Sequence, residues 1–495
     1  MCRPLTRREL LRYGALVAAT FPASRLARPG WSLAEDATRP SLLHPAVPMN
    51  LELVTVTDTE AAITWFTGDP TTLDQYQRPL PVAAPGRVLI GTSPNPTTWH
   101  QVGAHGATAY HYVRITGLRP GVRYFYRAES NGIPAVPTVV SPLNPDPSNG
   151  GVFTTLVPPP GGEILRIAWL NDLHMGEQYS GLAISNSSLP RGGLPPGFPA
   201  DPNDPYWRFM ARAAVAEAAG QGCKLMLVNG DVSNASEPAI LAEAKSMLDG
   251  FGALGGTGTV TPDSGPVYFV TRGNHDRAFA DDLHAGCPTV PGDPTFHDCF
   301  LETFAAGYAP GTSHFTVGVE SGSFRFRFVG LDSVVITTGD GNMPQSELDY
   351  LESVLELDDP TIPLFHHIVG TESTSTAVPP FVFGVDRPDA KRFQQLVAKH
   401  PNVAAVYNGH THRNLRSTSF DTRDLPYFEG GAVKEYPGGY TTVRMYRTGF
   451  MVNFWKTSDP ECRAWSERSR GEYLDLYPYY TLGGFSDRNW VRSFG

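Results

Sequence analysis

Five apolar segments between residues 164 and 412 each run directly into side chains that can bind a metal ion. Their polar ends are Asn171-Asp172-Leu173-His174, Asn229-Gly230-Asp231, Gly273-Asn274-His275-Asp276, His366-His367 and Asn408-Gly409-His410-Thr411-His412. An isolated Asp-x-His or Gly-Asp more often marks a turn or a core histidine, but five such ends in one chain make coincidence improbable. The donor atoms are all nitrogen and oxygen, which suits zinc, manganese or iron rather than a copper–thiolate site.

The apolar segments are predicted to be strands of an α/β core, and they must bring these polar ends together. The predicted strands are residues 164–170, 224–228, 267–270, 324–329, 362–365 and 403–407, and helical periodicity appears at residues 206–219, 238–248, 346–355 and 390–400. Apolar strands separated by helices are typical of a sheet that is buried on both faces. Because ligands bind at the carboxyl ends of such strands, the five polar ends are expected to meet at one edge. Short β-runs at residues 440–446 and 450–455 are expected to complete the sheet.

Residues 51–156 follow a different pattern of short alternating runs broken by turn residues. Predicted strands at residues 51–56, 62–66, 87–90, 110–115, 122–128 and 152–154, with no helical period between them, indicate a β-sandwich. The segment from Gly117 to Tyr124 resembles the tyrosine corner of fibronectin type III domains, in which the tyrosine hydroxyl bonds back to upstream backbone. We therefore predict a fibronectin type III-like domain at residues 48–156, a Pro/Gly-rich linker, and a second domain at residues 163–495.

In their order along the chain, the five polar ends resemble the signature of calcineurin-like metallophosphoesterases. The resemblance spans residues 172–412, about half of the chain, and every element of the signature is present. A fibronectin-like domain in front of it is similar to the layout of purple acid phosphatases. The resemblance implies an α/β catalytic domain with a β-sandwich core flanked by helices, preceded by the all-β fibronectin type III-like sandwich.

Carried over position by position, the resemblance implies two divalent or trivalent ions of iron, manganese or zinc. Asp172, His174 and His412 would bind one ion, Asn274, His366 and His410 would bind the other, and Asp231 would bridge the two. His366 is preferred to His367 because it directly follows its strand, but the sequence leaves this choice open.

Two departures from the purple acid phosphatase pattern are informative. Those enzymes have a tyrosinate ligand three residues after the first aspartate, where this chain has Met175. They also lack a histidine at the position of His174. The ligand set therefore resembles that of the non-purple branch, and no charge-transfer colour is expected.

The expected chemistry is the hydrolysis of phosphate esters. Two ions a few ångström apart can activate a bridging water, and the resulting hydroxide would attack phosphorus in line. His275 is expected to protonate the leaving oxygen, with Asp276 fixing its tautomer. Arg272, Arg277 and Arg413 flank the motifs and could hold a phosphate, but an isolated arginine is more often a surface or structural residue. The sequence does not separate a phosphomonoester from a phosphodiester substrate.

The first 34 residues are predicted to be an export signal and a short linker. Arg7 and Arg8 precede an apolar run at residues 13–21, a pattern that resembles a twin-arginine signal. The run is too short to span a bilayer, and no later segment approaches the roughly 20 apolar residues of a membrane helix. We expect the twin-arginine export machinery as a partner and a bacterial protein located in the periplasm, cell envelope or medium. Cys287 and Cys299 could form a disulfide there.

The charge balance limits the class of substrate. The chain has 49 acidic and 39 basic side chains and a formal net charge of -10. This argues against non-specific nucleic-acid binding, but a small phosphorylated substrate remains compatible because metal ions supply positive charge locally. The sequence thus favours a secreted phosphatase or phosphodiesterase. The alternatives are a nucleotidase or phospholipid-directed esterase, and an exported envelope-binding protein with a vestigial metal site. The oligomeric state stays open.

Overall fold

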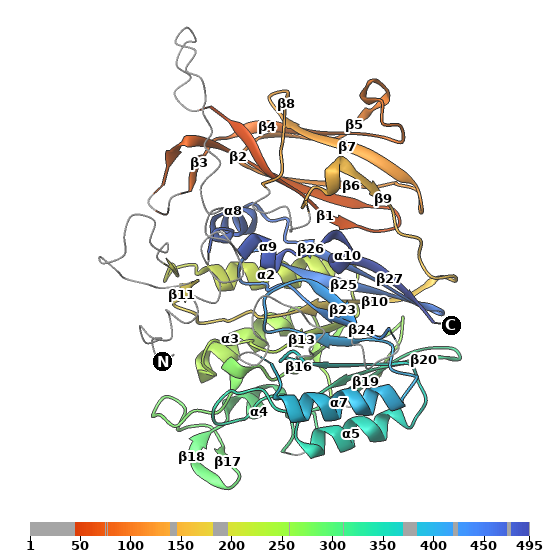
Figure 1. The fold of residues 1–495 in the computed structure, drawn as a ribbon. Coiled ribbons are helices and arrows are strands. Elements are labelled where there is room, and N and C mark those ends of the chain that lie inside the picture. Colours follow the sequence, from red (N-terminus) through yellow and green to blue (C-terminus); the bar gives the residue numbers. More distant parts are fainter. Residues whose placement is uncertain are drawn as a thin grey trace.

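The protein consists of two stacked units, an all-β unit and a larger unit with helices on both of its sides (Figure 1). The computed structural model describes residues 45–74, 76, 78–138, 146–181, 197–256, 258–309, 311–369, 384–418, 424–472 and 477–494. The predicted export signal at residues 1–34 lies outside these ranges.

The all-β unit, here called the N-terminal sandwich (residues 47–154), contains two antiparallel sheets. One sheet consists of β1 (Val47–Val56), β2 (Ala61–Leu73), β3 (Pro79–Pro81) and β6 (Tyr110–Ile115). The other consists of β5 (His100–Thr108), β4 (Ala84–Gly91), β7 (Arg123–Ser130), β8 (Ile133–Pro134) and β9 (Val152–Thr154). Alternate residues of both sheets, among them Ile63, Trp65, Val88 and Ile90, share one buried core. The alternating sequence pattern therefore correctly indicates two packed sheets.

Two details of this unit bear on the sequence prediction. The hydroxyl of Tyr124 accepts a hydrogen bond from the backbone N–H of Arg119 at 3.0 Å, which is the contact that a tyrosine corner requires. Strand β5 is missing from the sequence prediction, because it contains Gly103 and Gly106 and no run of β-branched residues.

The larger unit, here called the four-layer unit (residues 163–493), is built on two sheets of seven strands. The first sheet has the order β14 (Ala253–Leu254), β16 (Val267–Thr271), β13 (Leu225–Asn229), β10 (Glu163–Leu170), β25 (Gly439–Tyr446), β26 (Gly449–Lys456) and β27 (Asn489–Ser493). The second has the order β15 (Gly258–Val260), β19 (Phe315–Ser321), β20 (Phe324–Gly330), β21 (Thr361–Phe365), β22 (Val406–Asn408), β24 (Pro426–Glu429) and β23 (Leu415–Thr418).

Alternation along the strands decides which way each apolar side chain points. In β10, Ile167 and Trp169 belong to the core between the two sheets, whereas Ala168 and Leu170 belong to the core beneath the helices of the first sheet. Both faces of the strand are buried, which explains why its sequence is continuously apolar. The predicted β-sandwich core flanked by helices is therefore the observed architecture.

Helices cover the outer faces of both sheets (Figure 1). The first sheet is covered by α2 (Tyr206–Gly220), α3 (Pro238–Asp249) and α8 (Pro460–Ser469), and the second by α5 (Gln345–Leu355) and α7 (Arg387–Lys399). Shorter helices are α4 (Cys299–Phe304), α9 (Tyr477–Thr481) and α10 (Phe485–Arg488). The four helices predicted from periodicity are all present. Of the described helices, none has the length and hydropathy that crossing a membrane requires.

Several parts of the four-layer unit differ from the sequence prediction, which among others lacks strand β19. The predicted strand at residues 403–407 is reduced to β22, because the N–H of Val403 bonds to the carbonyl of His400 in a turn that follows α7. The prediction that the last segment completes the existing sheet is confirmed by β25 and β26, but β27 and helices α8 to α10 were not predicted. In α8, Cys462 and Trp465 are the only buried apolar residues, so the helical period of its apolar residues is weak.

A disulfide joins Cys287 to Cys299. It ties the start of the short hairpin of β17 (Thr289–Val290) and β18 (Asp293–His297) to the first residue of α4. The two other described cysteines, Cys223 and Cys462, are buried free thiols.

Candidate metal centre

Loops at the carboxyl ends of five strands carry the candidate ligands. The three strands β10, β13 and β16 come from the first sheet, and β21 and β22 come from the second. Parallel neighbours end in register, with Asn229 opposite Thr271 in the first sheet and Phe365 opposite Asn408 in the second. The sequence predicts that the polar ends meet, and candidate donor atoms from these loops do form groups within 4.8 Å of one another.

Five candidate ligands have a left-handed backbone conformation. The φ angle is 54° at Asp172, 44° at His174, 49° at Asp231, 69° at His410 and 55° at His412. Each such conformation costs on the order of 1–3 kcal/mol in a residue other than glycine. Backbone strain of this kind persists where surrounding contacts fix it, and it gathers at functional sites. Five of the seven ligands predicted from the motifs are therefore among the eleven described residues other than glycine that have a positive φ.

The first group of donors consists of Asp172, His174 and His412. The Nε2 atoms of His174 and His412 are 3.2 Å apart. The Oδ1 atom of Asp172 is 3.4 Å from Nε2 of His412. One carboxylate and two imidazoles, from the loops after β10 and β22, thus surround a common point.

The second group consists of Asn274, His366 and His410, which come from the loops after β16, β21 and β22. The Nε2 atom of His366 is 3.0 Å from Oδ1 of Asn274. It is 3.2 Å from Nδ1 of His410. His366 is completely buried, and its other ring nitrogen lies 3.0 Å from the backbone carbonyl oxygen of Asn229.

Asp231 lies between the two groups. Its Oδ2 atom is 3.3 Å from Nε2 of His174 and 3.2 Å from Nε2 of His366. Its Oδ1 atom accepts a hydrogen bond from the backbone N–H of His275 at 2.8 Å, which fixes the carboxylate plane. One carboxylate oxygen therefore faces donors of both groups.

The spacing and chemistry of these donors fit metal ions. Two ligand atoms that lie about 2.1 Å from a shared tetrahedral ion are about 3.4 Å apart, close to the separations in both groups. The Oδ2 atom of Asp172 is buried and has no hydrogen-bond partner among the described residues. Leaving such an atom unsatisfied costs about 1–3 kcal/mol, which a bound cation would relieve. Imidazole nitrogen with carboxylate and amide oxygen suits zinc, iron or manganese.

The protonation states of His174 and Asp231 also suit metal binding. Burial, followed by the nearby Lys434 ammonium, holds the pKa of His174 well below its ordinary value, so this imidazole is neutral. Burial alone would raise the pKa of Asp231, but the surrounding imidazoles, His366 first, hold it well below its ordinary value. Both side chains thus present lone pairs rather than protons.

The geometry favours His366 over His367 as the ligand. His366 points Nε2 toward Asp231 and the second group, as described above. His367 is also buried, but its Nδ1 lies 3.1 Å from the hydroxyl of Ser333, on the other side of the loop. The choice that the sequence leaves open is decided by which ring faces the shared carboxylate.

His275 lies at the edge of the ligand groups. Its ring centroid is 4.6 Å from that of His174. Its Nδ1 atom is 2.8 Å from the backbone carbonyl oxygen of Asn234, so Nδ1 carries the proton of that hydrogen bond. Nε2 is thereby left to exchange a proton with another molecule.

The predicted contact between Asp276 and His275 is wrong. The buried carboxylate of Asp276 accepts hydrogen bonds from the backbone N–H groups of Val232, Ser233 and Gly273, at 2.9 to 3.1 Å, and from the hydroxyl of Ser233 at 2.8 Å. Burial and then the charge of Asp231 raise the pKa of Asp276 to about 6. Asp276 therefore stabilises the loop that carries Asp231 through hydrogen bonds and does not fix the tautomer of His275.

Two of the three arginines that flank the motifs are not placed to hold a substrate phosphate. Arg272 is buried and paired with Asp298 at 2.8 Å and Asp332 at 2.9 Å. Arg413 is buried and forms a two-pronged ion pair with Glu429, at 2.6 and 2.8 Å. Their charges are taken up by carboxylates, so both are structural arginines, which is the interpretation that the sequence favours for each of them.

Sequence reasoning missed Glu435. Its carboxylate is completely buried, and Oε1 lies 2.7 Å from Nδ1 of His412. The residue belongs to the loop between β24 and β25 and stands 23 positions after His412. The dipeptide Lys434-Glu435 gives no sign in the sequence that Glu435 is buried, because lysine and glutamate usually lie on the surface.

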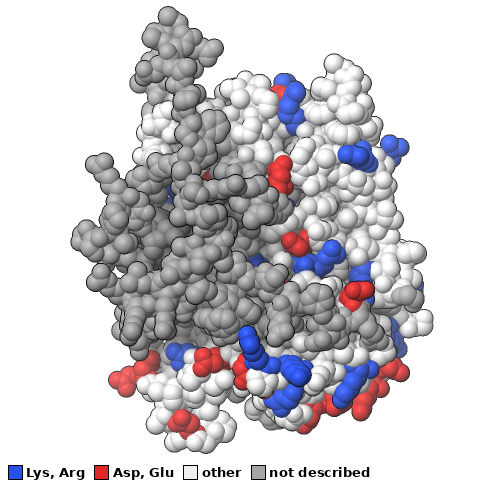
Figure 2. Space-filling model, in the orientation of Figure 1, with Lys and Arg blue, Asp and Glu red and all other residues white. Residues whose placement is uncertain are grey.

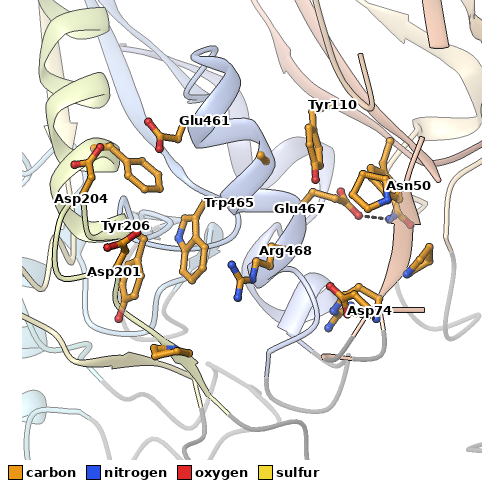
Figure 3. Close-up of a pocket in the computed structure, with 17 residues that line it drawn as sticks. Asn50, Asp74, Tyr110, Asp201, Asp204, Tyr206, Glu461, Trp465, Glu467 and Arg468 are labelled. Carbon is orange, nitrogen blue, oxygen red and sulfur yellow. Dashed lines mark hydrogen bonds between the residues drawn. The ribbon is translucent and has the colours of Figure 1, made fainter. Parts of the chain in front are cut away.

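A separate cavity of about 380 Å³ lies between the N-terminal sandwich and the four-layer unit. Figure 3 shows Tyr206 and Trp465 on one side of it and Asn50 and Tyr110 on the other. None of the described residues that line it is a candidate ligand. The ligand groups and this cavity are therefore two different places in the molecule.

Comparison with solved structures finds several phosphatases. A dimetal phosphatase from Danio rerio is 13% identical, with a TM-score of 0.39, over 60% of this chain and 98% of that one. A purple acid phosphatase from yellow lupin (Lupinus luteus) seeds is 14% identical, with a TM-score of 0.39, over 84% of this chain and 73% of that one. PhoD is 12% identical, with a TM-score of 0.33, over 84% of this chain and 87% of that one. No curated protein matches the sequence.

Comparison with known families is more specific. The calcineurin-like phosphoesterase family matches residues 165–414, about half of the chain. The matched range begins in β10 and ends just after His412, so it contains all the candidate ligands and both of their groups. The chain therefore belongs to the calcineurin-like phosphoesterase family and is a metal-dependent phosphoric ester hydrolase.

Proposed function

We propose that this protein is an exported enzyme that uses two metal ions to hydrolyse small phosphate esters. The observation that carries the proposal is the position of Asp231, whose Oδ2 lies within 3.3 Å of Nε2 in both His174 and His366. A carboxylate oxygen shared by two sets of donors is the arrangement that a bridged pair of ions requires.

The two donor groups would hold the ions, with Asp231 between them. Asp172, His174 and His412 would bind one, and Asn274, His366 and His410 the other. When bound, ions at this spacing supply an activated water and positive charge for the phosphoryl oxygens. The protein fixes the donors through the loop backbone and through the hydrogen bond from the N–H of His275 to Asp231.

His275 is the proposed proton donor to the leaving oxygen. Its Nδ1 proton is held by the carbonyl of Asn234, so Nε2 is the atom that would give up a proton. Asp276 keeps the Asp231 loop and the Gly273 turn together through four hydrogen bonds. We therefore assign His275 a catalytic role and Asp276 a positioning role.

Export through the twin-arginine route is part of the proposal. The paired Arg7 and Arg8 before a short apolar run motivate it. The disulfide between Cys287 and Cys299 supports it, because disulfides persist mainly outside the cytoplasm. In the native host, the protein should be found outside the cytoplasm without its first residues. An unprocessed cytoplasmic protein with free thiols at both cysteines would contradict export.

The surface supports a small substrate rather than a nucleic acid. On the face drawn in Figure 2, the described Lys and Arg residues stand among Asp and Glu residues instead of forming a continuous stripe. The formal net charge of -10 points the same way. We propose that the N-terminal sandwich is fibronectin type III-like on the basis of the Tyr124 contact. The cavity between it and the four-layer unit is lined by no candidate ligand among the described residues.

Hydrolysis assays with the purified protein test the proposal. p-Nitrophenyl phosphate and bis-p-nitrophenyl phosphate would be assayed before and after removal of metal by a chelator, and after re-addition of manganese, iron or zinc. We expect hydrolysis of at least one ester, loss after chelation and recovery with metal. The preferred ester distinguishes a phosphatase from a phosphodiesterase. Failure to hydrolyse either ester with any of the three ions would contradict the proposal and favour the envelope-binding alternative.

A further inference from the structure

Glu435 makes the two donor groups unequal. Its Oε1 atom lies 2.7 Å from Nδ1 of His412, the nitrogen that points away from the first donor group. Among the described residues, the hydrogen-bond partner of the outward Nδ1 of His366 is the neutral backbone carbonyl of Asn229, at 3.0 Å. The outward Nδ1 of His174 has no hydrogen-bond partner among the described residues. Of these three histidines, only His412 therefore has a carboxylate beside its outward nitrogen.

The carboxylate of Glu435 is itself held in place. The hydroxyl of Ser180 donates to Oε2 of Glu435 at 2.7 Å. The ammonium group of Lys434 lies 3.4 Å from the same oxygen and 2.6 Å from the carboxylate of Glu177. Glu435, Ser180 and Lys434 are each no more than 2% exposed. The contact between Glu435 and His412 is therefore supported by buried neighbours and is not a chance approach of two surface side chains.

The loop that carries Glu435 is fixed at both sides. The N–H of Val433 bonds to the carbonyl of Asn171, one residue before the candidate ligand Asp172. The indole N–H of Trp465 in α8 donates to the carbonyl of Lys434 at 2.7 Å. The loop is therefore anchored to the metal-site strand on one side and to the helix layer on the other.

We propose that Glu435 is a positioning residue that anchors His412 and strengthens metal binding in the first donor group only. A carboxylate that accepts the outer N–H of a ligating histidine fixes the ring orientation and raises the basicity of the ligating nitrogen. Loss of such a partner typically lowers metal affinity by about 10- to 100-fold. The inference rests on the proposed two-metal function. Its consequence is that loss of the Glu435 charge weakens the binding of one ion and not of the other.

The test compares Glu435→Gln with Glu429→Gln in chelator-competition titrations with zinc. Glutamine at position 435 can still accept the hydrogen bond of His412 but lacks the charge. Glu429 is a matched control, because it is also a buried carboxylate beside the loop that carries His412. It contacts Thr411 and Arg413 of that loop but no candidate ligand. We expect Glu435→Gln to lose about 10- to 100-fold in affinity at one of two sites. We expect Glu429→Gln to bind both ions as the wild type does.

His412→Ala identifies the site that is affected. If Glu435 acts through His412, then Glu435→Gln adds no further loss of affinity in the His412→Ala background. An additive loss, an equal loss at both sites, or unchanged affinity at both sites would each overturn the inference. Should Glu435→Gln fail to fold, Ser180→Ala removes only the hydroxyl that orients Glu435. It should weaken the same site several-fold, and unchanged affinity there would overturn the inference as well.

The wild-type titration separates this inference from the proposed function. A wild-type chain that binds fewer than two zinc ions contradicts the two-metal proposal itself. Two ions in the wild type, with a Glu435→Gln variant that is indistinguishable from it, leaves the proposed function intact and removes only the role of Glu435.

Discussion

His275 contributes to the candidate metal centre through both its side chain and its backbone. Its Nδ1 is held by a backbone carbonyl in the loop after β13, and its own backbone N–H supports the bridging candidate Asp231. The side chain and the backbone of this residue therefore have separate roles. Only the side chain is positioned to transfer a proton, whereas the backbone N–H supports the carboxylate that is the candidate bridging ligand.

Replacing His275 by alanine separates these two roles. The backbone N–H that donates to Asp231 is retained, so the metal content of the variant should equal that of the wild type. The imidazole is lost, so kcat should fall by about 100-fold or more. Both quantities can be measured on the same preparation. A variant that loses metal, or that keeps wild-type kcat, would contradict the proposed role.

The candidate ligands could be chosen from the sequence, but several of their supporting contacts could not. Asp172 and His412 are recognisable because each belongs to a motif of characteristic spacing that follows an apolar strand. Glu435 and the carbonyl of Asn234 are not, because their role depends on a loop that returns to the site from elsewhere in the fold. The pairing of Asp276 was predicted wrongly for a related reason. Adjacency in sequence to His275 says nothing about which backbone N–H groups surround a buried carboxylate.

At the level of elements, the loops after β13 and β16 lie in direct contact at Gly273. A Cβ added at this residue would lie 2.0 Å from the backbone nitrogen of Asp231 and 2.2 Å from its Oδ1 atom. No flexible side-chain end is available there to move aside, because the first neighbour is backbone. Glycine at this position is what allows the two strands to deliver Asp231 and Asn274 to the same site.

Replacing Gly273 by alanine should therefore damage the site without unfolding the sheet. The added methyl group must displace the Asp231 loop, so we expect at least one metal ion per chain to be lost and activity to fall with it. Gly162→Ala, at the start of β10, is the control, since a Cβ there meets no heavy atom within 4 Å. Metal analysis and circular dichroism of both variants provide the check. Full metal content in Gly273→Ala would show that the loops have room that the structure does not indicate.

The elements that sequence pattern recovers are those with a strong period. Strand β10 is apolar on both faces and α2 has a clear buried face, and both were placed within one or two residues. Strand β5 and helix α8 were missed, because glycine in the first and few apolar residues in the second weaken the local signal. Tertiary contacts, rather than the local preference of the sequence, stabilise these two elements.

At the scale of the whole molecule, a buried ionic network joins the two units. Glu52 of β1 accepts a hydrogen bond from Lys456 of β26 at 2.6 Å and another from the hydroxyl of Tyr436 at 2.7 Å. The guanidinium of Arg488 also donates to the backbone carbonyls of Val54 and Leu53, at 3.2 and 2.9 Å. Because these groups are buried, the N-terminal sandwich should unfold together with the four-layer unit.

The ionisation of Glu52 makes this coupling depend on pH. Burial alone would raise the pKa of Glu52, but Lys456 and then Arg470 lower it from 4.5 to about 2. A carboxylate whose pKa is lowered by folding stabilises the folded state above its unfolded pKa, and this contribution is lost as the pH falls toward the folded pKa. The stabilisation from Glu52 is therefore complete above about pH 4.5 and disappears toward pH 2.

Glu52→Gln should accordingly lower the free energy of unfolding strongly at neutral pH and much less in acid. Removing one member of a buried ion pair leaves Lys456 uncompensated, at about 3–5 kcal/mol. Denaturant unfolding of both proteins at a series of pH values measures the difference. We expect the gap in free energy of unfolding to narrow as the pH falls from 4.5 toward 2. A gap that is constant with pH, or that widens in acid, would contradict the assigned ion pair.

The most direct test of the two-metal site is the metal content of the wild type and of Asp231→Ala. One carboxylate oxygen of Asp231 faces both donor groups, so the loss of this side chain should affect both ions at once. Inductively coupled plasma mass spectrometry of the purified proteins gives the ratio of metal to chain. We predict about two ions of iron, manganese or zinc per wild-type chain and fewer than one in the variant. A wild-type chain with no stoichiometric metal, or an Asp231→Ala chain that retains two ions, would contradict a bridged pair of metal ions.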